Sequence, residues 1–593
     1  MIEKMRKYSF VLYHLDYNEF LKELQKLGMV HLIKTTDIQT ESLSKNLELI
    51  KEYSENLKYL TKLGSDAAKV SVNMPAIALY NKIEAAREEK EALNRKAEIL
   101  RKQVKDLAPW GHFDYKLVDS IAAQGIKVEF RTCLKNHFKP EWLEDHSIRV
   151  INEVGGITYF VLFYEGDRPA IDADVFSFHH HTLQELESQL DEVNGQIAAI
   201  DEYLHGIAPT AIEMFTQEMS ELSRVCEYEE ATLQGISEAD DHLRVLSGWI
   251  PVRKEPELQT FLQDKGVIHF VSDAKGEDNP PVSLRNNWFA RLFEPISRMY
   301  MLPFYDDLDL TPFFAPFFML FYGFCNADMA YGVVVVLLGL FLRYKLKNPA
   351  MKSIMMLIVI FGIASFIMGW VMGSALGFDL KKTFMNPSIL IRNNDQIFNF
   401  ALLLGAIQIL FGVIINAFKQ ARQGGFRYFL APLGTFLFLL SLSVLGAGLL
   451  KVDISKVQPY VKYPLVAGLL LMMLFNDPQK NILMNILGGL WVLYGVVTGF
   501  FGDILSYIRL FALGVSSAIL GFVINSIGQQ FLSIKIVGPV IFIVFMLVGH
   551  ALNIALGALS GFVHPLRLTF VEFFNNAGFS GPGIEYKPFG YKK

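Results

Sequence analysis

The segment FGDILSYIRLFALG, residues 501–514, places Arg509 in a part of the chain that otherwise carries almost no charge. Uncharged windows lie on either side, at 481–502 and 510–534, and Asp503 is the one other charged residue between them. A helix of about 18 or more such residues can cross the hydrocarbon of a bilayer. An arginine at the centre of a span costs roughly 2.5 to 3.5 kcal/mol on insertion scales, so we expect Arg509 to face protein or water and not lipid.

Apolar windows of this kind recur from residue 310 onward. Any one could be a buried core helix, but so many in succession predict an all-α polytopic membrane domain of about eight helices at 301–593, with 481–500 leading into the seventh. Two windows are shorter and would span with flanking side chains reaching the surface. The long windows are 310–327, 353–378, 396–418, 428–450, 481–502, 510–534 and 536–566, and the short ones are 329–342 and 463–476.

The orientation in the membrane follows from the first residues and the loop charges. Residues 1–10 contain no apolar signal region, so we expect 1–300 to be cytoplasmic, and an even number of spans returns the C-terminus to the cytoplasm. Loop cations support this multi-pass cell-membrane topology only in part. The inside loops carry Arg343, Lys345, Lys347, Lys352, Lys419, Arg422 and Arg427, but the outside loops carry Lys381, Lys382, Arg392, Lys451, Lys456 and Lys462.

Charge divides the chain into two halves. Residues 1–300 carry 35 Lys+Arg and 49 Asp+Glu, a net charge of −14, whereas the remainder carries 20 and 11, a net charge of +9. An acidic soluble half does not suit nucleic acid, which needs a basic face. We find no phosphate-binding GxxxxGK[ST], no GxGxxG opening a helix and no Ser/His/Asp arrangement, so neither catalytic residues nor a cofactor is predicted.

Cysteine and histidine usage gives no metal site. Cys133, Cys226 and Cys325 stand in no paired or metal-ligand spacing, which predicts no disulfide framework and fits a reducing compartment. The run His179, His180 and His181 could bind a metal, but no Cys or acidic residue stands at ligand spacing beside it. The alternative is that these three histidines form a polar run beside a helix start without binding a metal. We predict this second interpretation.

Heptad seams dominate the middle of the soluble half. Apolar positions, with Lys90 among them, alternate at spacings of four and three in 83–107, recur in 183–204, and are looser in 43–60. This pattern predicts an antiparallel coiled-coil arm with segments 41–109 and 182–235. The seam residues are Ala86, Lys90, Leu93, Ala97, Leu100, Val104 and Leu107 on one side and Leu183, Leu186, Leu190, Val193, Ile197, Ile200 and Leu204 on the other.

Two small α/β lobes complete this soluble α+β half. In the distal lobe, 110–181, the β-branched and aromatic runs 126–131 and 157–163 read as strands that flank a helical stretch. In the proximal lobe, 1–40 and 236–300, an internal repeat places Leu24-Gln25, Gly28 and His31 at the same offsets as Leu262-Gln263, Gly266 and His269. We expect the two copies to pair in one domain, with both histidines at strand starts.

The last apolar window carries a polar stripe. His550, Asn553, Gly557, Ser560, His564 and Arg567 follow one another at steps of three and four, which places them on one face of a helix. Such a stripe, ending near Glu572, is what a helix lining a hydrated ion path would carry. The alternative is a set of interhelical hydrogen bonds. Pro565 removes one helical hydrogen bond and predicts a kink beside Arg567.

These segments resemble a known family. Residues 502–514 and 549–573, with VHPLRL at 563–568 and VEF at 571–573, are similar to the last two membrane helices of subunit a, also called subunit I, of the vacuolar/archaeal-type ATPases. LTPFFAP at 310–316, with Ala327-Asp328 and Tyr331-Gly332, resembles the first membrane hairpin of that family, and YKPF at 586–589 resembles its closing segment. The length of 593 residues resembles its shorter prokaryotic branch.

The resemblance implies a role for both arginines. In that family two arginines face the carboxylates of a rotor ring, and by motif they match Arg509 and Arg567 in this chain. A guanidinium stays charged and favours the ionised carboxylate, so an arriving rotor carboxylate would release its ion into one half-channel before loading from the other. The half-channel residues implied are Asp503, Ser506, His550, Asn553, Ser560, His564 and Glu572. Where some eukaryotic members carry a His after the first arginine, Ser517 stands in this chain.

The resemblance also implies partners. A non-catalytic membrane stator would contact a rotor proteolipid c/K ring, peripheral stalk E/G subunits, a central-stalk d/C subunit and the lipid bilayer, and would couple H+ or Na+ transport to ATP hydrolysis or synthesis. A secondary ion-coupled transporter is the main alternative, but it would need a midplane substrate site and repeats within the membrane half. A membrane tether with a coiled-coil arm would leave the two arginines without a role.

Overall fold

The computed structural model describes the chain except for residues 35–39, 65–73, 114, 178–181, 380–392, 451–454, 478–480, 535–536 and 591–593. The run His179, His180 and His181 and the loop residues Lys381, Lys382, Arg392 and Lys451 therefore lie outside the described residues. The chain forms two compact units. One is built mainly from Asn18–Lys26 and Lys34–Gln234, and the other from Met1–Tyr17, Leu27–Ile33 and Gly235–Phe589.

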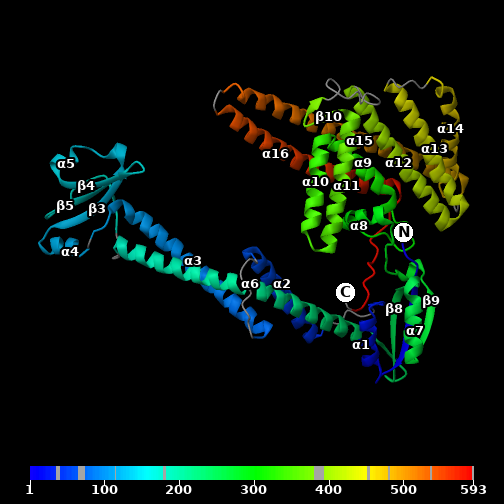
Figure 1. Cartoon of the computed structure of the whole chain (residues 1–593), viewed down its shortest axis with the longest axis horizontal. Helices are drawn as coiled ribbons and strands as arrows, with labels where there is room; N and C mark the ends of the chain where they lie inside the picture. Colours follow the sequence, from blue (N-terminus) through cyan, green and yellow to red (C-terminus); the bar gives the residue numbers. More distant parts are fainter. Residues whose placement is uncertain are drawn as a thin grey trace. The chain divides into compact units, whose positions relative to one another are not determined.

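Long helices form most of the first unit (Figure 1). The seam residues of α3 and α6 pack against each other, and the pairs Lys90–Asp201 and Arg101–Asn194 give an antiparallel direction. Thr182 and Glu185 bond reciprocally to each other's backbone N–H in a capping box, which fixes the start of α6. The helices are α1 (Tyr17–Leu27), α2 (Glu41–Leu63), α3 (Ala76–Leu107), α4 (Tyr115–Ala123), α5 (Trp142–Asp145) and α6 (Leu183–Leu233).

This pairing predicts an intrachain crosslink. Leu93 on α3 and Ile197 on α6 belong to one apolar cluster. We expect cysteines at these two positions to form a disulfide within one chain on mild oxidation, because the seam is filled by the chain's own helices. Non-reducing gels and peptide mapping would measure it. A crosslink found only between two copies would show that the seam belongs to a dimer.

A four-stranded antiparallel sheet lies between α3 and α6 in the sequence. Its strands are β3 (Lys127–Leu134), β4 (Ser147–Val154), β5 (Ile157–Tyr164) and β6 (Asp174–Val175), in the order β4-β5-β3-β6. The prediction of a helical stretch between the two strand runs is wrong in part. Helix α5 is short, and strand β4 occupies residues 147–154. Gly155 and Gly156, with φ of 63° and 79°, make the tight β4–β5 turn. The Gly-Gly pair between alternating residues was the signal for it.

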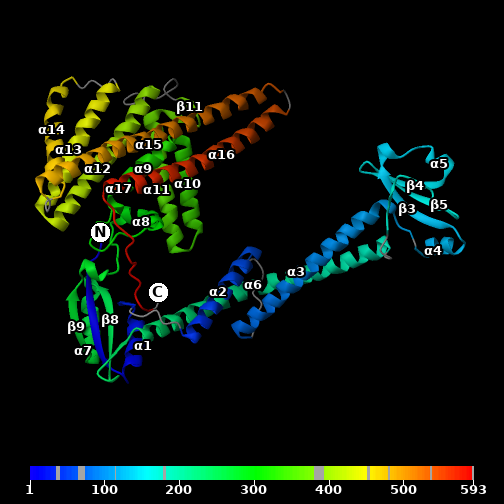
Figure 2. The ribbon, with the colours of Figure 1, turned by 180° about the vertical axis from the view of Figure 1, so that it is seen from behind.

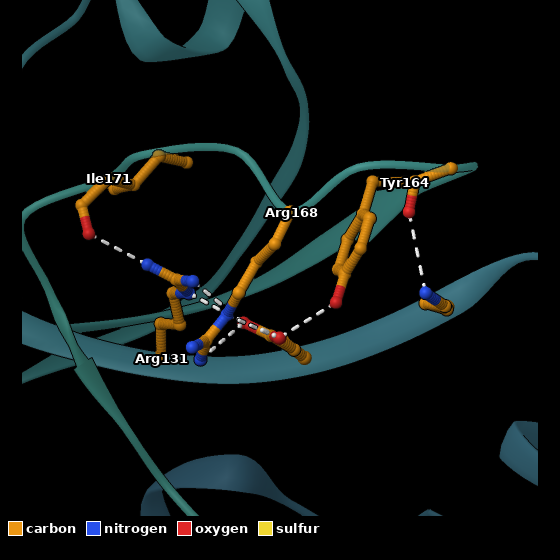
Figure 3. Close-up of polar contacts among 7 residues, drawn as sticks. Arg131, Tyr164, Arg168 and Ile171 are labelled. Atoms are coloured by element: carbon orange, nitrogen blue, oxygen red, sulfur yellow. Dashed lines mark hydrogen bonds and ion pairs between the residues drawn. The ribbon is translucent and has the colours of Figure 1, made fainter.

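A cluster of charged side chains around the buried Arg131 stabilises this sheet (Figure 3). Arg131 donates from Nε and Nη2 to Glu129 Oε2, at 3.0 and 2.7 Å, and from Nη1 to the Ile171 carbonyl at 2.8 Å. Tyr164 and Arg168 donate to Glu129 Oε1 at 2.8 and 2.9 Å. Because the Arg131 side chain is only 3% exposed, its charge depends on Glu129 for compensation.

This cluster makes the sheet sensitive to acid. Burial alone raises the pKa of Glu129, but hydrogen bonds from Arg131, Tyr164 and Arg168 outweigh it and hold that pKa below its usual value. The resulting stability is present above the unfolded pKa of about 4.3 and is lost as the pH falls through the folded pKa. We expect β3 and β5 to lose hydrogen-exchange protection below about pH 4. Glu129→Gln should remove this dependence, and unchanged protection in wild type at about pH 3 would contradict it.

The second unit contains a sheet with an internal repeat. Strands β1 (Met5–Tyr13), β2 (His31–Leu32), β7 (Ile236–Glu238), β8 (Leu243–Pro251) and β9 (Ile268–Asp273) pair in the order β2-β8-β1-β9, with β7 on β8. In the sequence, α1 separates β1 from β2, and α7 (Glu255–Lys265) separates β8 from β9. Gly28 and Gly266 both have φ of 64° after these helices, where residues other than glycine are strained. The two copies thus lie in one sheet, and His31 begins β2.

The C-terminal segment 584–589 forms hydrogen bonds with this sheet and with Val282, which follows the last strand of the sheet in the sequence. The Phe589 N–H donates to the Val30 carbonyl at 2.7 Å, and Val282 exchanges hydrogen bonds with Ile584 and Tyr586. The Lys587 N–H donates to His31 Nδ1 at 3.0 Å. The repeated histidine is therefore more than a strand-start residue, because it holds the closing segment.

Helices make up the remainder of the second unit (Figures 1 and 2). Among the described residues, five helical segments are long and apolar enough to cross a membrane. They are α11 (Pro349–Met372), α12 (Asn394–Gly424), the span Phe426–Gly448 of α13, α15 (Ile482–Phe531) and the segment Gly538–Asn576. As helices, α13 comprises Phe426–Leu449 and α16 comprises Gly538–Arg567. The remaining elements are α8 (Trp288–Tyr300), α9 (Thr311–Cys325), α10 (Met329–Lys345), β10 (Ser374–Ala375), β11 (Phe378–Asp379), α14 (Gln458–Leu474) and α17 (Phe574–Asn576).

The two windows around Arg509 form one helix. α15 has 50 residues, about 75 Å at 1.5 Å per residue, which far exceeds a hydrocarbon layer of about 30 Å. Both views show α15 and α16 side by side and crossing the other apolar helices instead of following them (Figures 1 and 2). A helix of this length fits a bilayer only with a steep tilt.

Candidate functional site

α15 and α16 leave most of their apolar surface uncovered. Only 28% of the most apolar window of α15 and 17% of that of the α16 segment is buried, against 56% in α11. The span of α13 is covered to the same 28% as that of α15. Bundle helices normally bury one face on their neighbours, so these helices present a surface to lipid or to another protein.

Arg509 lies near the middle of α15 and is half-buried. Its Nη1 atom is buried and has no hydrogen-bond partner among the residues that the structure describes. A buried, unpartnered guanidinium nitrogen is unfavourable in an apolar helix. The arrangement suits a group whose partner is carried by another molecule.

Arg567 lies at the end of α16, where the α-helix changes to a π-helix. α16 runs through Pro565 and continues as a π-helix, η6 (Leu568–Phe573). The Arg567 side chain is 55% exposed, and its Nε stands 3.9 Å from Oε1 of Glu572, which is 2% exposed. At that distance the pair is a loose ion contact and not a hydrogen bond. The Arg567 guanidinium therefore remains available to an outside partner.

The polar stripe of α16 changes from buried to exposed along its length. His550 is held by Tyr331 Oη at its Nδ1 (2.7 Å) and by Asn525 Oδ1 at its Nε2 (3.2 Å). Asn553 donates to Tyr331 Oη at 2.9 Å and to the Ser517 carbonyl at 3.3 Å. Ser560 and His564 are half-buried. The first two residues thus make interhelical hydrogen bonds, and the last two lie toward Arg567.

Asp328 is linked through the β10–β11 turn to Asn525, near the C-terminal end of α15. Its carboxylate accepts from the Ala330, Tyr331, Leu376 and Gly377 amides and from Ser374 Oγ, at 2.9 to 3.1 Å. Leu376 in turn accepts at 2.6 Å from Asn525 of α15. Asp328 therefore ties α10 and the β10–β11 turn to α15.

Asp503 and Ser506 lie about one turn apart on α15 and make different contacts. Asp503 Oδ2 accepts from Asn576 Nδ2 at 2.6 Å, and the same amide donates to the Glu572 carbonyl at 2.7 Å. Ser506 donates back to the Gly502 carbonyl at 3.1 Å. The structure thus brings Asp503 and Glu572 together at one end of the site.

Sequence reasoning missed several polar residues of this region. Tyr507 donates to Gln408 Oε1 at 2.7 Å, with neither side chain exposed. Asn525 was also missed, and Tyr331 was noted only within the motif that resembles the first membrane hairpin, without its contacts to His550 and Asn553. The signal for Gln408 was a long polar side chain inside the uncharged window 396–418, because buried amides need partners. Among the described residues, no group of three or more His, Cys, Asp or Glu could hold a metal ion.

Soluble α/β and helical parts joined to a set of apolar helices, with isolated charges on the last two, define a polytopic membrane protein. Residues 33–374, more than half of the chain, match the model of the V-type ATPase 116kDa subunit family. The chain belongs to that family.

Curated relatives agree with this assignment. The V-type ATP synthase subunit I of Borreliella burgdorferi is 25% identical, and the alignment covers 99% of each chain. The A-type ATP synthase subunit I of Methanocaldococcus jannaschii is 26% identical over 70% of this chain and 65% of that one. A solved cytoplasmic N-terminal domain of subunit I, homolog of subunit a of V-ATPase, covers 45% of this chain at 14% identity and a TM-score of 0.19, which is too low to support an argument.

Proposed function

We propose that this chain is the membrane stator subunit of a V/A-type rotary ATPase, which couples H+ or Na+ movement to ATP hydrolysis or synthesis. One observation supports the proposal: two arginines lie on α15 and α16, two apolar helices whose surfaces are mostly uncovered. Arg509 is half-buried with a nitrogen that has no hydrogen-bond partner among the described residues, and Arg567 is largely exposed. A rotor ring of proteolipids with membrane carboxylates would cover that surface and pair with both guanidiniums.

The half-channels follow from the same geometry. Ser560, His564 and Glu572 stand within seven residues of Arg567 in the sequence, and Asp503 and Ser506 precede Arg509 by six and three residues along α15. Ions would reach the rotor carboxylate along these polar residues and leave on the other side of Arg509, which blocks direct leakage by its fixed charge. His550 and Asn553 would bound the path from the far end through their hydrogen bonds.

The soluble part would serve as the static arm. Its domains would be the proximal lobe 1–40 and 236–300, the coiled-coil arms 41–109 and 182–235, and the distal lobe 110–181, with peripheral stalk E/G and central-stalk d/C subunits as partners. The membrane domain 301–593 would cross a cell membrane eight times, with α9, α10 and α14 as shorter spans of 15, 17 and 17 residues. The N-terminal domain and C-terminus would be cytoplasmic.

Purification from native membranes tests the class of protein. We expect a tagged chain to bring down a ring of small two- or four-helix proteolipids together with nucleotide-binding subunits. The chain by itself should bind and hydrolyse no ATP, since its sequence has no phosphate-binding loop. A purified chain that moves a solute across liposomes without these partners would instead be a secondary transporter.

A further inference from the structure

A buried polar cluster near the middle of α16 joins three helices. It contains His550 and Asn553 of α16, Tyr331 of α10 and Asn525 of α15, and none of these four residues is more than 9% exposed. Buried polar atoms are almost always hydrogen-bonded. The donor and acceptor role of each atom in the cluster therefore follows from the groups that it contacts.

Backbone carbonyls fix the orientation of the two asparagine amides. The Asn553 amide lies 3.3 Å from the Ser517 carbonyl, and the Asn525 amide lies 2.6 Å from the Leu376 carbonyl. A carbonyl oxygen only accepts, so the amide atom that faces it must be the Nδ2 nitrogen. The Oδ1 atom of Asn525 is then the atom that faces His550, at 3.2 Å.

These orientations determine the state of the His550 ring. Asn525 Oδ1 only accepts, so the Nε2 atom of His550 must bear a proton and donate it. Tyr331 Oη accepts from Asn553 Nδ2 at 2.9 Å, so its own proton is left to donate to His550 Nδ1, 2.7 Å away. The hydrogen-bond network thus assigns the Nε2–H form to His550, with an acceptor at Nδ1.

The chain of donors continues beyond Asn525 to a carboxylate. The peptide group between Leu376 and Gly377 accepts from Asn525 at its carbonyl and donates from the Gly377 N–H to Asp328 Oδ2 at 3.0 Å. Asp328 is 4% exposed and accepts four further hydrogen bonds. Every bond from Asn553 to Asp328 therefore points toward one negative charge, an arrangement in which neighbouring hydrogen bonds strengthen one another.

This chain attaches a helix that is otherwise little covered. The apolar window of the α16 segment is only 17% buried, and beyond Arg567 the segment is held by Leu568 and Phe573 in apolar clusters. Asn553 and His550 stand 14 and 17 residues before Arg567, which is about 21 and 26 Å along an α-helix. Attachment at two separated points fixes the tilt of α16 relative to α15, and with it the spacing of the two arginines.

We propose that His550 is a positioning residue, which acts in its Nε2–H form as a fixed hydrogen-bond connector between α10, α15 and α16. Through the chain that ends on Asp328, it holds α16 at the tilt that places Arg567 relative to Arg509. The consequence for ion movement rests on the proposed function, whereas the state of His550 does not.

Replacement of His550 by glutamine tests this role. A glutamine side chain offers an acceptor and a donor, as the Nε2–H ring does, but it does not titrate. ATP-driven transport per assembled complex should fall about tenfold in His550→Leu, because misplacing a functional group by even about 1 Å can cost up to about a hundredfold. His550→Gln should restore most of it. A glutamine variant as impaired as the leucine variant would show that the ring must titrate, and would overturn the proposal.

The carboxylate end of the chain has a test of its own. Asp328→Asn keeps the shape but replaces one acceptor oxygen by a donor, in a site where four backbone amides already donate. It should also cut transport per assembled complex about tenfold. Asp395→Asn, at an exposed carboxylate in the first turn of α12, is the matched control and should transport normally. Equal transport by the two variants would contradict the role of the chain.

Solid-state nitrogen NMR of the assembled complex, labelled at histidine, reads the state of His550 without any transport. Its signals are those lost in His550→Gln. We expect one proton-bearing and one proton-free ring nitrogen, with Asn525→Leu shifting the first signal and Tyr331→Phe the second. The reverse assignment, or two proton-bearing nitrogens, would refute the inference and leave the stator function intact. A wild-type complex that transports no ions would refute the stator function, and the nitrogen signals would still decide the state of His550.

Discussion

Arg509→Ala should leave the complex assembled and cut ATP-driven ion transport about a hundredfold, because a nearby opposite charge shifts a carboxyl pKa by about one to three units. The lost guanidinium is the group that would hold the rotor carboxylate ionised midway along α15. The Nη1 atom of Arg509 makes no hydrogen bond to the described part of the chain. The substitution therefore breaks no hydrogen bond of that atom there. The measurement is ion uptake by proteoliposomes, normalised to the rotor subunit that co-purifies.

Two further variants sharpen this result. Arg509→Lys should also fail, because an ammonium keeps the charge but loses the planar fork and the resistance to deprotonation. Arg422→Ala, at an exposed position at the end of α12, is the matched control and should transport normally. A structural role for Arg509 predicts the reverse pattern, in which assembly is lost and transport per assembled complex stays near normal.

Arg567→Ala should have a smaller but still severe effect, a loss of about tenfold in transport per assembled complex, at the low end of what a nearby charge contributes. The Arg567 side chain is 55% exposed, so water can replace part of its interaction. For the same reason Arg567→Lys should retain more transport than Arg509→Lys does.

The loose contact with Glu572 gives a control for this second prediction. At 3.9 Å, the Arg567–Glu572 pair should contribute little by itself. Arg567→Ala should therefore reduce transport equally in the wild-type and Glu572→Gln backgrounds. If Arg567→Ala had no effect once Glu572 was changed, Arg567 would act through Glu572 and not on the rotor.

The sequence by itself determined the features that depend on local pattern. Apolar windows indicate helices that can cross a membrane, and the position of Arg509 between two of them predicts a functional charge, because insertion cost depends on residue type and position in the window. The spacing of Leu93, Leu100 and their neighbours was enough for the seam, because heptads place a stripe on one face of a helix. The steps from His550 to Arg567 define a polar face for the same reason.

Only the tertiary structure decided which polar side chains meet. The partners of His550 are Tyr331 and Asn525, and that of Tyr507 is Gln408, 99 residues away. Such pairs depend on which helices pack together and in which direction, and no local period encodes this. The structure alone also showed that α15 is one continuous helix through Asp503 and Arg509. Asn576, from another segment, supplies the hydrogen bond that Asp503 needs within this helix. A buried polar group needs such a partner.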